Sequence, residues 1–464
     1  MLPPGVQTLG INLYEFNEWK LRRNKKFNKW LNILLDSERW DKEELDAYQN
    51  KNLKAIVNYA YKHVPFYHNL YNELDIDISK IKCSEDLELL PIISKDDILR
   101  SSGLYDTKTM ERFVIRYTSG TTGSPLKVKI SESSDVLIKA NAFRRDLWAG
   151  YKGDLIARFV GDKPVRNCNG KSLYRKSYIM NRCIFPSYCL SMDTLPNIIN
   201  TLKKLKIEML QCYPSTAYII AKYLQINDEY LPLNALLYSS EPIDNFSREL
   251  IEDRFQTKIF GFYGQAEGVI SAIECEKGEY HLTMLDGILE IIKNEERVYS
   301  GEKGFTIGTS LHNYAMPLIR YALNDYTGYI DYDMNTDSLC GRTLPRIYPI
   351  ETKLEDFIVT SSGRFFTPPS IMALMKNRQN IIESQIIQKD IDFVLIRLVV
   401  SETYNDLDEM HLKESFIRLF GEQVSIQVEY VSSIHPSASF KKQRVKSELG
   451  REYIENLFQN NSQI

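Results

Sequence analysis

YTSGTTGSP, residues 117–125, combines four hydroxyl side chains and two glycines within positions 118–123. Such a segment packs poorly into a core, whereas its glycines let the backbone approach a ligand and expose N–H groups to an anion. A phosphate group is the natural occupant. The segment is not a Walker motif, because the GK[ST] ending is missing and the nearest lysine is Lys127. On composition alone, an ordinary Ser/Thr/Gly hairpin turn is an equal alternative.

Downstream of this segment, from about residue 195 to 270, helical and strand-like patterns alternate. Helices are predicted at 195–205, 217–224 and 246–255, and strands at 207–212, 235–238 and 258–263. Alternation of this kind predicts parallel strands joined by crossover helices, and ligands bind at the carboxyl ends of such strands. Upstream, residues 42–63 are predicted as a helix with Asp41 and Glu44 as a capping pair.

The length and composition exclude several classes of protein. At about 150 residues per domain, 464 residues predict roughly two or three domains. The charge is balanced at −3, so no positive field favours a nucleic acid, and a small-molecule ligand is expected. No stretch approaches the ~20 consecutive apolar residues that a membrane crossing needs, which predicts a cytoplasmic protein without a transmembrane segment.

Seven cysteines are scattered along the chain without a CxxC pair. The odd number and the spacing argue against a disulfide framework and against a zinc site. Reduced thiols in the cytosol fit better, and Cys340 is interpreted as a small buried apolar residue.

Several motifs, taken in order, resemble one family. TSGTTGSP followed closely by a lysine resembles the phosphate loop of the adenylate-forming acyl- and aryl-CoA ligase superfamily. FGFYGQAE at 260–267 is similar to the YGxTE segment of that superfamily, and Asn313, Pro317, LIRY at 318–321 and Asp325 resemble its N…P-L-I-R-Y…D segment. VPFY at 64–67, LPIISKDDI at 90–98, YPS at 213–215 and CGRTLPRI at 340–347 indicate the branch of phenylacetate-CoA ligase and capsular-polysaccharide CapK-like proteins.

The resemblance implies an α/β fold in two domains. A large N-terminal domain, residues 1–352, would contain parallel and mixed sheets with flanking helices and would bind ATP and the acyl substrate. A small, mobile α+β domain, residues 353–464, would follow it. The pattern past about residue 350 agrees, because a strand-rich stretch leads into alternating segments at 393–400, 412–420 and 424–431.

The resemblance also assigns residues to ATP and Mg²⁺. The residues expected at the β- and γ-phosphates are Thr118, Ser119, Gly120, Thr121, Thr122, Gly123 and Lys127. Those expected beside the adenine or the acyl pocket are Tyr263, Gly264, Gln265, Ser240, Glu241 and Pro242. Glu267 would ligate Mg²⁺, Asp325 would accept the ribose hydroxyls, and Arg320 would meet phosphate or ribose oxygens. Taken singly, a solvated carboxylate explains Glu267, a core aromatic explains Tyr263, and a surface ion pair explains Arg320 with Asp325.

Three catalytic residues are expected: Glu267, Arg320 and Lys441. SASFKKQRV at 437–445 is similar to the family's S-G-K segment, which places Lys441 at the catalytic lysine, with Lys442 as the alternative. Phe440 stands where glycine is usual. ETKLEDFIVT at 351–360 resembles the family's GRxDDFIVT hinge, with Lys353 in place of arginine. Lys353 is therefore expected among the cofactor-binding residues. Ala266 replaces a hydroxyl residue.

The implied reaction joins a carboxylate to the α-phosphorus of ATP and releases pyrophosphate, with Mg²⁺ and cationic groups neutralising the phosphates. The acyl group would then pass to a thiol, of coenzyme A or a carrier protein, or to an amine, with polysaccharide synthesis as one setting. The alternative is a nucleotide-binding scaffold in a polysaccharide-assembly complex that has lost turnover. Ala266, Lys353 and Phe440 motivate this alternative.

Overall fold

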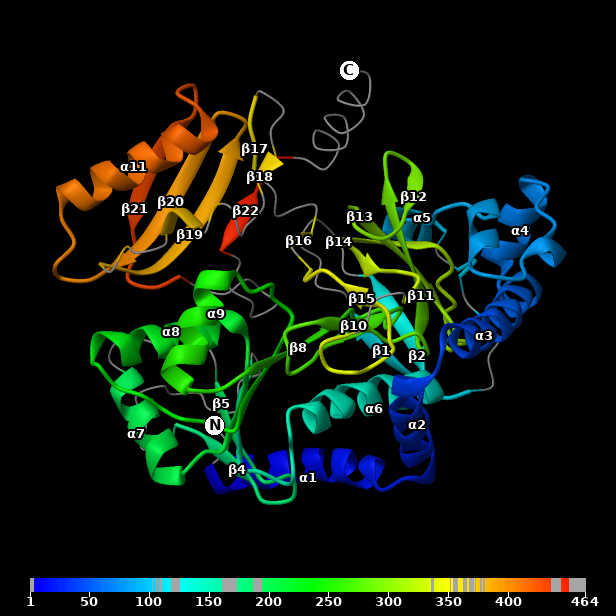
Figure 1. Cartoon of the computed structure of the whole chain (residues 1–464), viewed down its shortest axis with the longest axis horizontal. Coiled ribbons are helices and arrows are strands. Elements are labelled where there is room, and N and C mark those ends of the chain that lie inside the picture. The colour runs from blue at the N-terminus through cyan, green and yellow to red at the C-terminus, as the bar shows by residue number, and fades with distance from the viewer. Residues whose placement is uncertain are drawn as a thin grey trace. The chain divides into compact units, whose positions relative to one another are not determined.

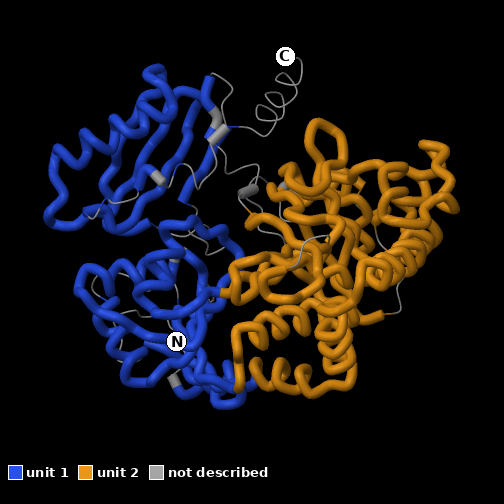
Figure 2. The backbone as a smooth tube through the Cα atoms, viewed as in Figure 1, with its two compact units in different colours: residues 1–13, 153–259, 351–464 blue, residues 14–152, 260–350 orange. Residues whose placement is uncertain are grey.

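The computed structural model describes residues 4–101, 103–105, 107, 111–117, 126–160, 173–186, 194–334, 338–350, 352–353, 358–361, 365–366, 371, 373–375, 378, 380–434 and 444–449. The chain forms two compact units, coloured separately in Figure 2. Unit 1 comprises residues 1–13, 153–259 and 351–464, and unit 2 comprises residues 14–152 and 260–350. The chain therefore passes between the units several times, and neither is one continuous segment.

The main sheet of unit 2 is largely antiparallel. Its strands follow the order β12-β11-β13-β14-β15-β10-β9-β8 (Figure 1). The bounds are β8 Ile259–Gly264, β9 Ser271–Glu274, β10 Tyr280–Leu282, β11 Gly287–Lys293, β12 Glu296–Val298, β13 Lys303–Ser310, β14 Tyr321–Asp331 and β15 Arg346–Ile347. A separate hairpin consists of β1 Phe113–Tyr117 and β2 Lys127–Ser131.

Helices of unit 2 share one apolar core with this sheet. Their bounds are α2 Lys25–Asp36, α3 Lys42–His63, α4 Pro65–Glu73, α5 Lys95–Arg100 and α6 Glu132–Trp148, while α1 Pro4–Arg22 crosses the division between the units. The predicted helix at 42–63 is confirmed, and Asp41 and Glu44 form a reciprocal capping box at its start. Leu45, Leu53 and Ile56 recur at helical spacing on its buried face.

Parallel strands and helices alternate in unit 1, as the pattern at 195–270 predicted. The bounds are β3 Ile156–Val160, β4 Arg175–Ser177, β5 Arg182–Pro186, α7 Leu195–Leu205, β6 Met209–Cys212, α8 Pro214–Ile226, β7 Ala235–Ser239 and α9 Asn245–Phe255. The order is β7-β6-β3-β5-β4, and all these neighbours except β4 and β5 are parallel. Apolar residues of α7, α8 and α9 pack on the sheet in one cluster.

The C-terminal part of the chain contains a separate sheet of order β21-β20-β19-β22, with α11 across one face (Figure 1). The bounds are β19 Ile381–Asp390, β20 Phe393–Val400, α11 Asp406–Phe420, β21 Ser425–Tyr430 and β22 Val445–Ser447. Short strands β16 Thr352–Lys353, β17 Ile358–Val359 and β18 Phe365–Phe366 precede it. Ile396, Phe416 and Phe420 belong to its own core.

The predicted fold class is thus confirmed: an α/β protein with large sheets, flanking helices and a distinct C-terminal α/β domain. A boundary between residues 352 and 353 and the mobility of the C-terminal domain stay predictions. Among the described residues, no helix combines the length and the apolar character needed to cross a membrane.

Candidate nucleotide site

Part of the predicted phosphate site falls outside the described residues. The residues concerned are Thr118, Ser119, Gly120, Thr121, Thr122 and Gly123. Lys441, the predicted catalytic lysine, also lies outside the described residues. The flanking strands are described: β1 and β2 pair antiparallel, and Tyr117 lies opposite Lys127. Lys127 is exposed at the start of β2. Lys127 thus begins the strand that follows the hydroxyl-rich segment in the sequence.

Tyr263 and Asp325 come together from strands β8 and β14. The Tyr263 hydroxyl donates a hydrogen bond of 2.7 Å to Asp325 Oδ2. Burial, together with the negative charge of Asp325, raises the pKa of Tyr263 well above its ordinary value, so the phenol stays a donor. The Asp325 backbone is held by Thr306, whose Oγ1 donates to its carbonyl at 3.1 Å. Asp325 is 3% exposed, and the structure gives this carboxylate a fixed position.

Glu267 and Gln265 lie in the turn that follows Gly264 at the end of β8. The turn is closed by a hydrogen bond from the Gly268 N–H to the Gln265 carbonyl, and Gly268 has a φ of +62°. Glu267 is half-buried, and its Oε1 accepts a hydrogen bond of 3.4 Å from the Tyr321 hydroxyl. Gln265 Nε2 is a buried donor, and among the described residues no acceptor meets hydrogen-bond geometry with it. A ligand acceptor would satisfy this amide.

Arg320, at the entrance to β14, has an internal partner. Its Nε and Nη2 bind the Glu290 carboxylate at 3.1–3.2 Å and 2.9 Å, and its Nη1 donates to the Leu90 carbonyl at 2.6 Å. Glu290 is fully buried and Arg320 is 7% exposed. The predicted contact of Arg320 with the nucleotide stays a prediction, and it would compete with Glu290 for the same guanidinium.

The remaining predicted residues belong to unit 1. Ser240, Glu241 and Pro242 follow the end of β7, where ligands bind in parallel sheets. Ser240 has a φ of +76°, a conformation that non-glycine residues rarely adopt and that recurs at binding sites. Lys353 lies in β16, and its side chain is outside the described residues.

Sequence reasoning missed a buried polar network in unit 2. Arg144 donates to the Leu34 carbonyl at 3.0 Å and to Thr283 Oγ1 at 2.8 Å, and Asn141 donates to Ser271 and Thr283. Ser271 donates to Asp286, whose pKa burial raises to about 7. In the sequence, the one sign of this network is that Asn141 and Arg144 are spaced i, i+3 and therefore share one face of a helix. This spacing does not show whether that polar face is buried or exposed.

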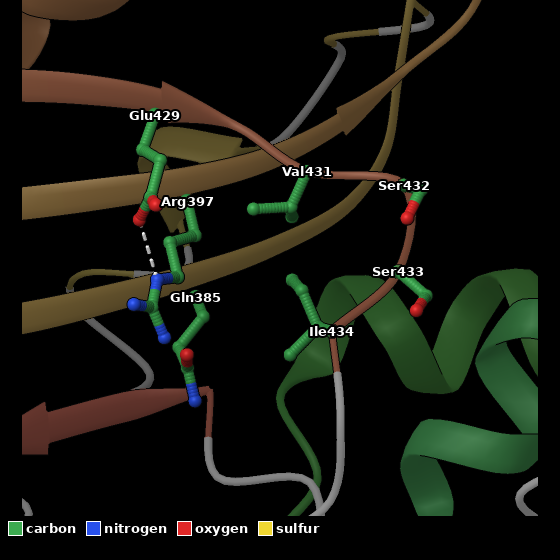
Figure 3. Close-up of a pocket in the computed structure, with 7 residues that line it drawn as sticks. All are labelled: Gln385, Arg397, Glu429, Val431, Ser432, Ser433 and Ile434. Atoms are coloured by element: carbon green, nitrogen blue, oxygen red, sulfur yellow. Dashed lines mark hydrogen bonds and ion pairs between the residues drawn. The ribbon is translucent and has the colours of Figure 1, made fainter.

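A cavity of about 400 Å³ lies in the C-terminal domain and contains none of the predicted site residues (Figure 3). Arg397 of β20 and Glu429 of β21 face each other at its wall, and Arg397 Nε binds Glu429 Oε2 at 2.7 Å. Gln385 lies beside Arg397, while Val431 and Ile434 supply an apolar wall. Because the charges of Arg397 and Glu429 neutralise each other, the cavity has no strong preference for a charged ligand.

Comparison with known proteins gives agreement over most of the chain. Residues 358–448 match the CapK C-terminal domain. The chain is 24% identical over 419 residues to protein CapK of Staphylococcus aureus, covering 86% of this chain and 88% of that protein. It is 25% identical over 408 residues to a phenylacetate-coenzyme A ligase of Thermus thermophilus, covering 82% and 85% respectively.

Solved structures of a 2-hydroxyisobutyryl-CoA ligase have the same fold. The form in the postadenylation state, in complex with R3-HIB-AMP, aligns with a TM-score of 0.67 at 21% identity and covers 92% of this chain and 96% of that chain. The form in the thioesterification state, with 2-HIB-AMP and CoA, aligns with a TM-score of 0.53 at 21% identity and covers 91% and 95%. At this identity the likeness establishes the fold of the chain.

Proposed function

We propose that this homologue of CapK and of the phenylacetate-coenzyme A ligases, which has the fold of the adenylate-forming ligases, activates a small carboxylic acid with ATP. The carboxylate oxygen attacks the α-phosphorus, pyrophosphate leaves, and an acyl-adenylate forms. A thiol then attacks the acyl carbon, and AMP leaves with the electron pair of the broken acyl–oxygen bond.

The observation that carries this proposal is the pair of Tyr263 and Asp325. The Asp325 carboxylate accepts a hydrogen bond from a neutral hydroxyl in a largely buried position. A ribose offers the same kind of donor, and an ionised carboxylate acts only as an acceptor. Nearby in the sequence, the Gln265 amide supplies a buried donor that lies close to the Tyr263 hydroxyl but meets no acceptor with full hydrogen-bond geometry among the described residues. A nucleoside provides both hydroxyl donors and ring acceptors, and therefore matches the two requirements.

The Glu267 carboxylate, in the turn that follows β8, is a suitable ligand for Mg²⁺. Mg²⁺ typically binds one or two protein carboxylates and completes its octahedron with phosphate oxygens and water. Glu267 provides one half-buried carboxylate whose partner is the neutral Tyr321 hydroxyl at 3.4 Å. When bound, the ion would neutralise phosphate charge during the attack. Lys127 and the hydroxyl-rich segment at 118–123 belong to the proposal as the binding site of the terminal phosphates.

The attacking group needs no general base, because a carboxylic acid with a pKa near 4 is ionised at pH 7. The obstacle is repulsion between two anions, so rate enhancement would come from alignment and charge neutralisation. Lys441 is proposed as the mobile cationic group and Lys353 as a cation of the hinge segment that binds the nucleotide. Ser240, Glu241 and Pro242 are proposed to lie beside the adenine or the acyl group. Because relatives are coenzyme A ligases, a thiol is the preferred acceptor, and an amine in polysaccharide synthesis is the alternative.

Pyrophosphate exchange tests the proposal. The full chain is supplied with ATP, Mg²⁺, labelled pyrophosphate and a panel of acids that includes phenylacetate and 2-hydroxyisobutyrate. Exchange dependent on one of the acids is expected, with hydroxamate formation when hydroxylamine is added. Asp325→Asn should lower the exchange, while Asp333→Asn, an exposed position just beyond β14, serves as the matched control.

The same experiment, combined with calorimetry, distinguishes the ligase from the second candidate function, a nucleotide-binding scaffold. ATP binding in calorimetry without exchange or hydroxamate formation across the panel would favour the nucleotide-binding scaffold, which the departures at Ala266, Lys353 and Phe440 motivate. Absence of both exchange and ATP binding would contradict the ligase and the scaffold alike.

A further inference from the structure

Four potential metal ligands converge in unit 2, and none of them is a residue assigned to ATP. They are Cys275, Glu279, His281 and Cys340, and their ligand atoms all lie within 4.8 Å of one another. Cys340 Sγ is 3.2 Å from His281 Nε2, and Glu279 Oε2 is 4.0 Å from the same nitrogen. Because Zn–S and Zn–N bonds measure about 2.3 and 2.0–2.1 Å, atoms around a tetrahedral ion lie roughly 3.3–3.8 Å apart.

The β9–β10 hairpin places three of these residues on one face. The Cys275 N–H donates to the Glu279 carbonyl at 2.8 Å, and the Gly278 N–H donates to the Cys275 carbonyl at 2.9 Å. Tyr280 pairs with Glu274, so Cys275 lies opposite Glu279. Side chains alternate along a strand, and His281 therefore shares the face of Glu279. The turn thus brings together residues whose spacing in the sequence, Cys-x3-Glu-x-His, matches no familiar zinc motif.

The fourth residue comes from the segment that leads into β15. Ser338 Oγ donates to Glu279 Oε2 at 2.9 Å, and the Leu339 N–H donates to the same oxygen at 3.0 Å. These bonds hold the segment beside the hairpin and present Cys340 to His281. Strand β15 continues the attachment, because His281 pairs with Arg346. Local spacing in the sequence therefore could not reveal this partner, which lies 59 residues away.

Neighbouring groups orient the ligands as in known metal sites. His281 is fully buried, and its Nδ1 lies 3.3 Å from the Leu344 carbonyl, which leaves Nε2 to face the cluster. Arg346 Nη1 donates to Glu279 Oε1 at 2.6 Å, so the other carboxylate oxygen faces His281. Cys275 is buried and Cys340 is half-buried. Each ligand type is held with one atom directed at a common point.

We propose that Cys275, Glu279, His281 and Cys340 bind a structural Zn²⁺ ion. Two thiolates and an imidazole favour zinc over magnesium or calcium, which prefer oxygen ligands. Four protein ligands make a closed site, which suits stabilisation rather than catalysis. The ion fixes the β9–β10 hairpin to the segment before β15. This replaces the expectation from cysteine spacing that the chain has no zinc site, and it is independent of the proposed ligase activity.

Metal analysis of the full chain tests the site. The protein is purified without a metal-affinity column and dialysed against metal-free buffer, and its zinc content is measured by mass spectrometry. We expect about one zinc ion per chain, and an at least tenfold lower content in Cys275→Ser and in Cys340→Ser. Cys83→Ser, at a half-buried free cysteine outside the cluster, is the matched control and should keep the ion.

Measurements on the unaltered chain cover the case in which the variants fail to fold. Chelation should lower the melting temperature, and Co²⁺ added to the metal-free chain should give thiolate-to-cobalt charge-transfer absorption. Three results would each overturn the proposal: a stable wild-type chain without zinc and without the cobalt absorption, equal zinc loss in Cys83→Ser, or a Cys275–Cys340 disulfide in protein purified under reducing conditions.

Discussion

Arg320 and Asp325 lie on either side of the start of β14, and one sequence motif assigned both to the nucleotide. In the structure their surroundings differ. Arg320 is matched by the full opposite charge of buried Glu290, whereas Asp325 accepts from the neutral hydroxyl of Tyr263. A neutral donor is displaced by a ligand hydroxyl at much lower cost than a buried ion pair is opened. The comparison teaches that a charged residue in a motif can bind a ligand at low cost only when the ligand can replace its hydrogen-bond partner within the protein.

Removing Arg320 should have the largest effect, and it should act on stability. Arg320→Ala leaves the Glu290 carboxylate buried without its counter-charge, and we expect the free energy of unfolding to fall by about 3–5 kcal/mol. Urea unfolding measures this change. Replacing both partners, as Arg320→Leu with Glu290→Leu, should recover most of the loss, and Arg112→Ala, at an exposed position, should change little. A stable Arg320→Ala chain that has lost exchange activity would contradict the comparison.

Asp325→Asn should act on activity instead. The substitution keeps the shape of the side chain but removes charge-assisted hydrogen bonds, each of which contributes about 1.5–3 kcal/mol. We therefore expect kcat/KM for ATP in pyrophosphate exchange to fall roughly 10- to 100-fold, with a nearly unchanged melting temperature. The contrary result would be a variant that is less stable but whose folded fraction exchanges pyrophosphate at the normal rate. Asp325 would then have a structural role, like Glu290, and would not bind the ligand.

Asp286 tests the effect of burial on a carboxylate that, among the described residues, has no ion-pair partner in contact, although the charge of Arg144 acts on it from nearby. Its Oδ1 lacks a hydrogen-bond partner among the described residues, and burial raises its pKa from 3.8 to about 7. The folded state therefore holds a proton that the unfolded state releases. This stabilisation is fully present below about pH 4 and is lost as the pH rises through about 7.

In Asp286→Asn this contribution is absent at every pH. Between pH 5 and 7, the wild-type unfolding free energy should fall relative to the variant by up to about 1.4 kcal/mol per pH unit. Urea unfolding of both proteins at each pH gives the difference. Parallel pH profiles for wild type and variant would show that the Asp286 carboxyl does not titrate in this range.

Tyr263→Phe should give the smallest effect. The change removes one hydroxyl donor to Asp325 and keeps the ring, so we expect a loss of about 1 kcal/mol in stability. If a ribose hydroxyl replaces this donor, the affinity for ATP should stay the same or rise, because the Tyr263 hydroxyl then no longer competes for Oδ2. Calorimetric titration with ATP measures the affinity. A fall of more than about tenfold would mean that the Tyr263 hydroxyl itself contacts the ligand.

The sequence by itself determined the repeating parts of the fold. Helix α3 with its capping box and the alternation of β6, α8, β7 and α9 were predicted to within a few residues. The C-terminal succession of β20, α11 and β21 was predicted as three alternating segments, and α11 begins six residues before the expected 412. These features depend on apolar periodicity and on capping between near neighbours, which are local properties of the chain. The ordered motifs likewise indicated the resemblance to CapK and the phenylacetate-coenzyme A ligases, with which the chain is 24–25% identical.

Tertiary structure decided which groups meet across long separations in the sequence. Arg320 pairs with Glu290, Arg144 reaches Thr283, and Cys340 reaches His281 only because strands and loops distant in sequence become neighbours in unit 2. Charge balance and metal-ligand geometry depend on distances between side chains in space, and no local pattern of residue types encodes those distances. For this reason the motifs did not reveal that Arg320 is already paired with Glu290, and the cysteine spacing concealed the proposed zinc site.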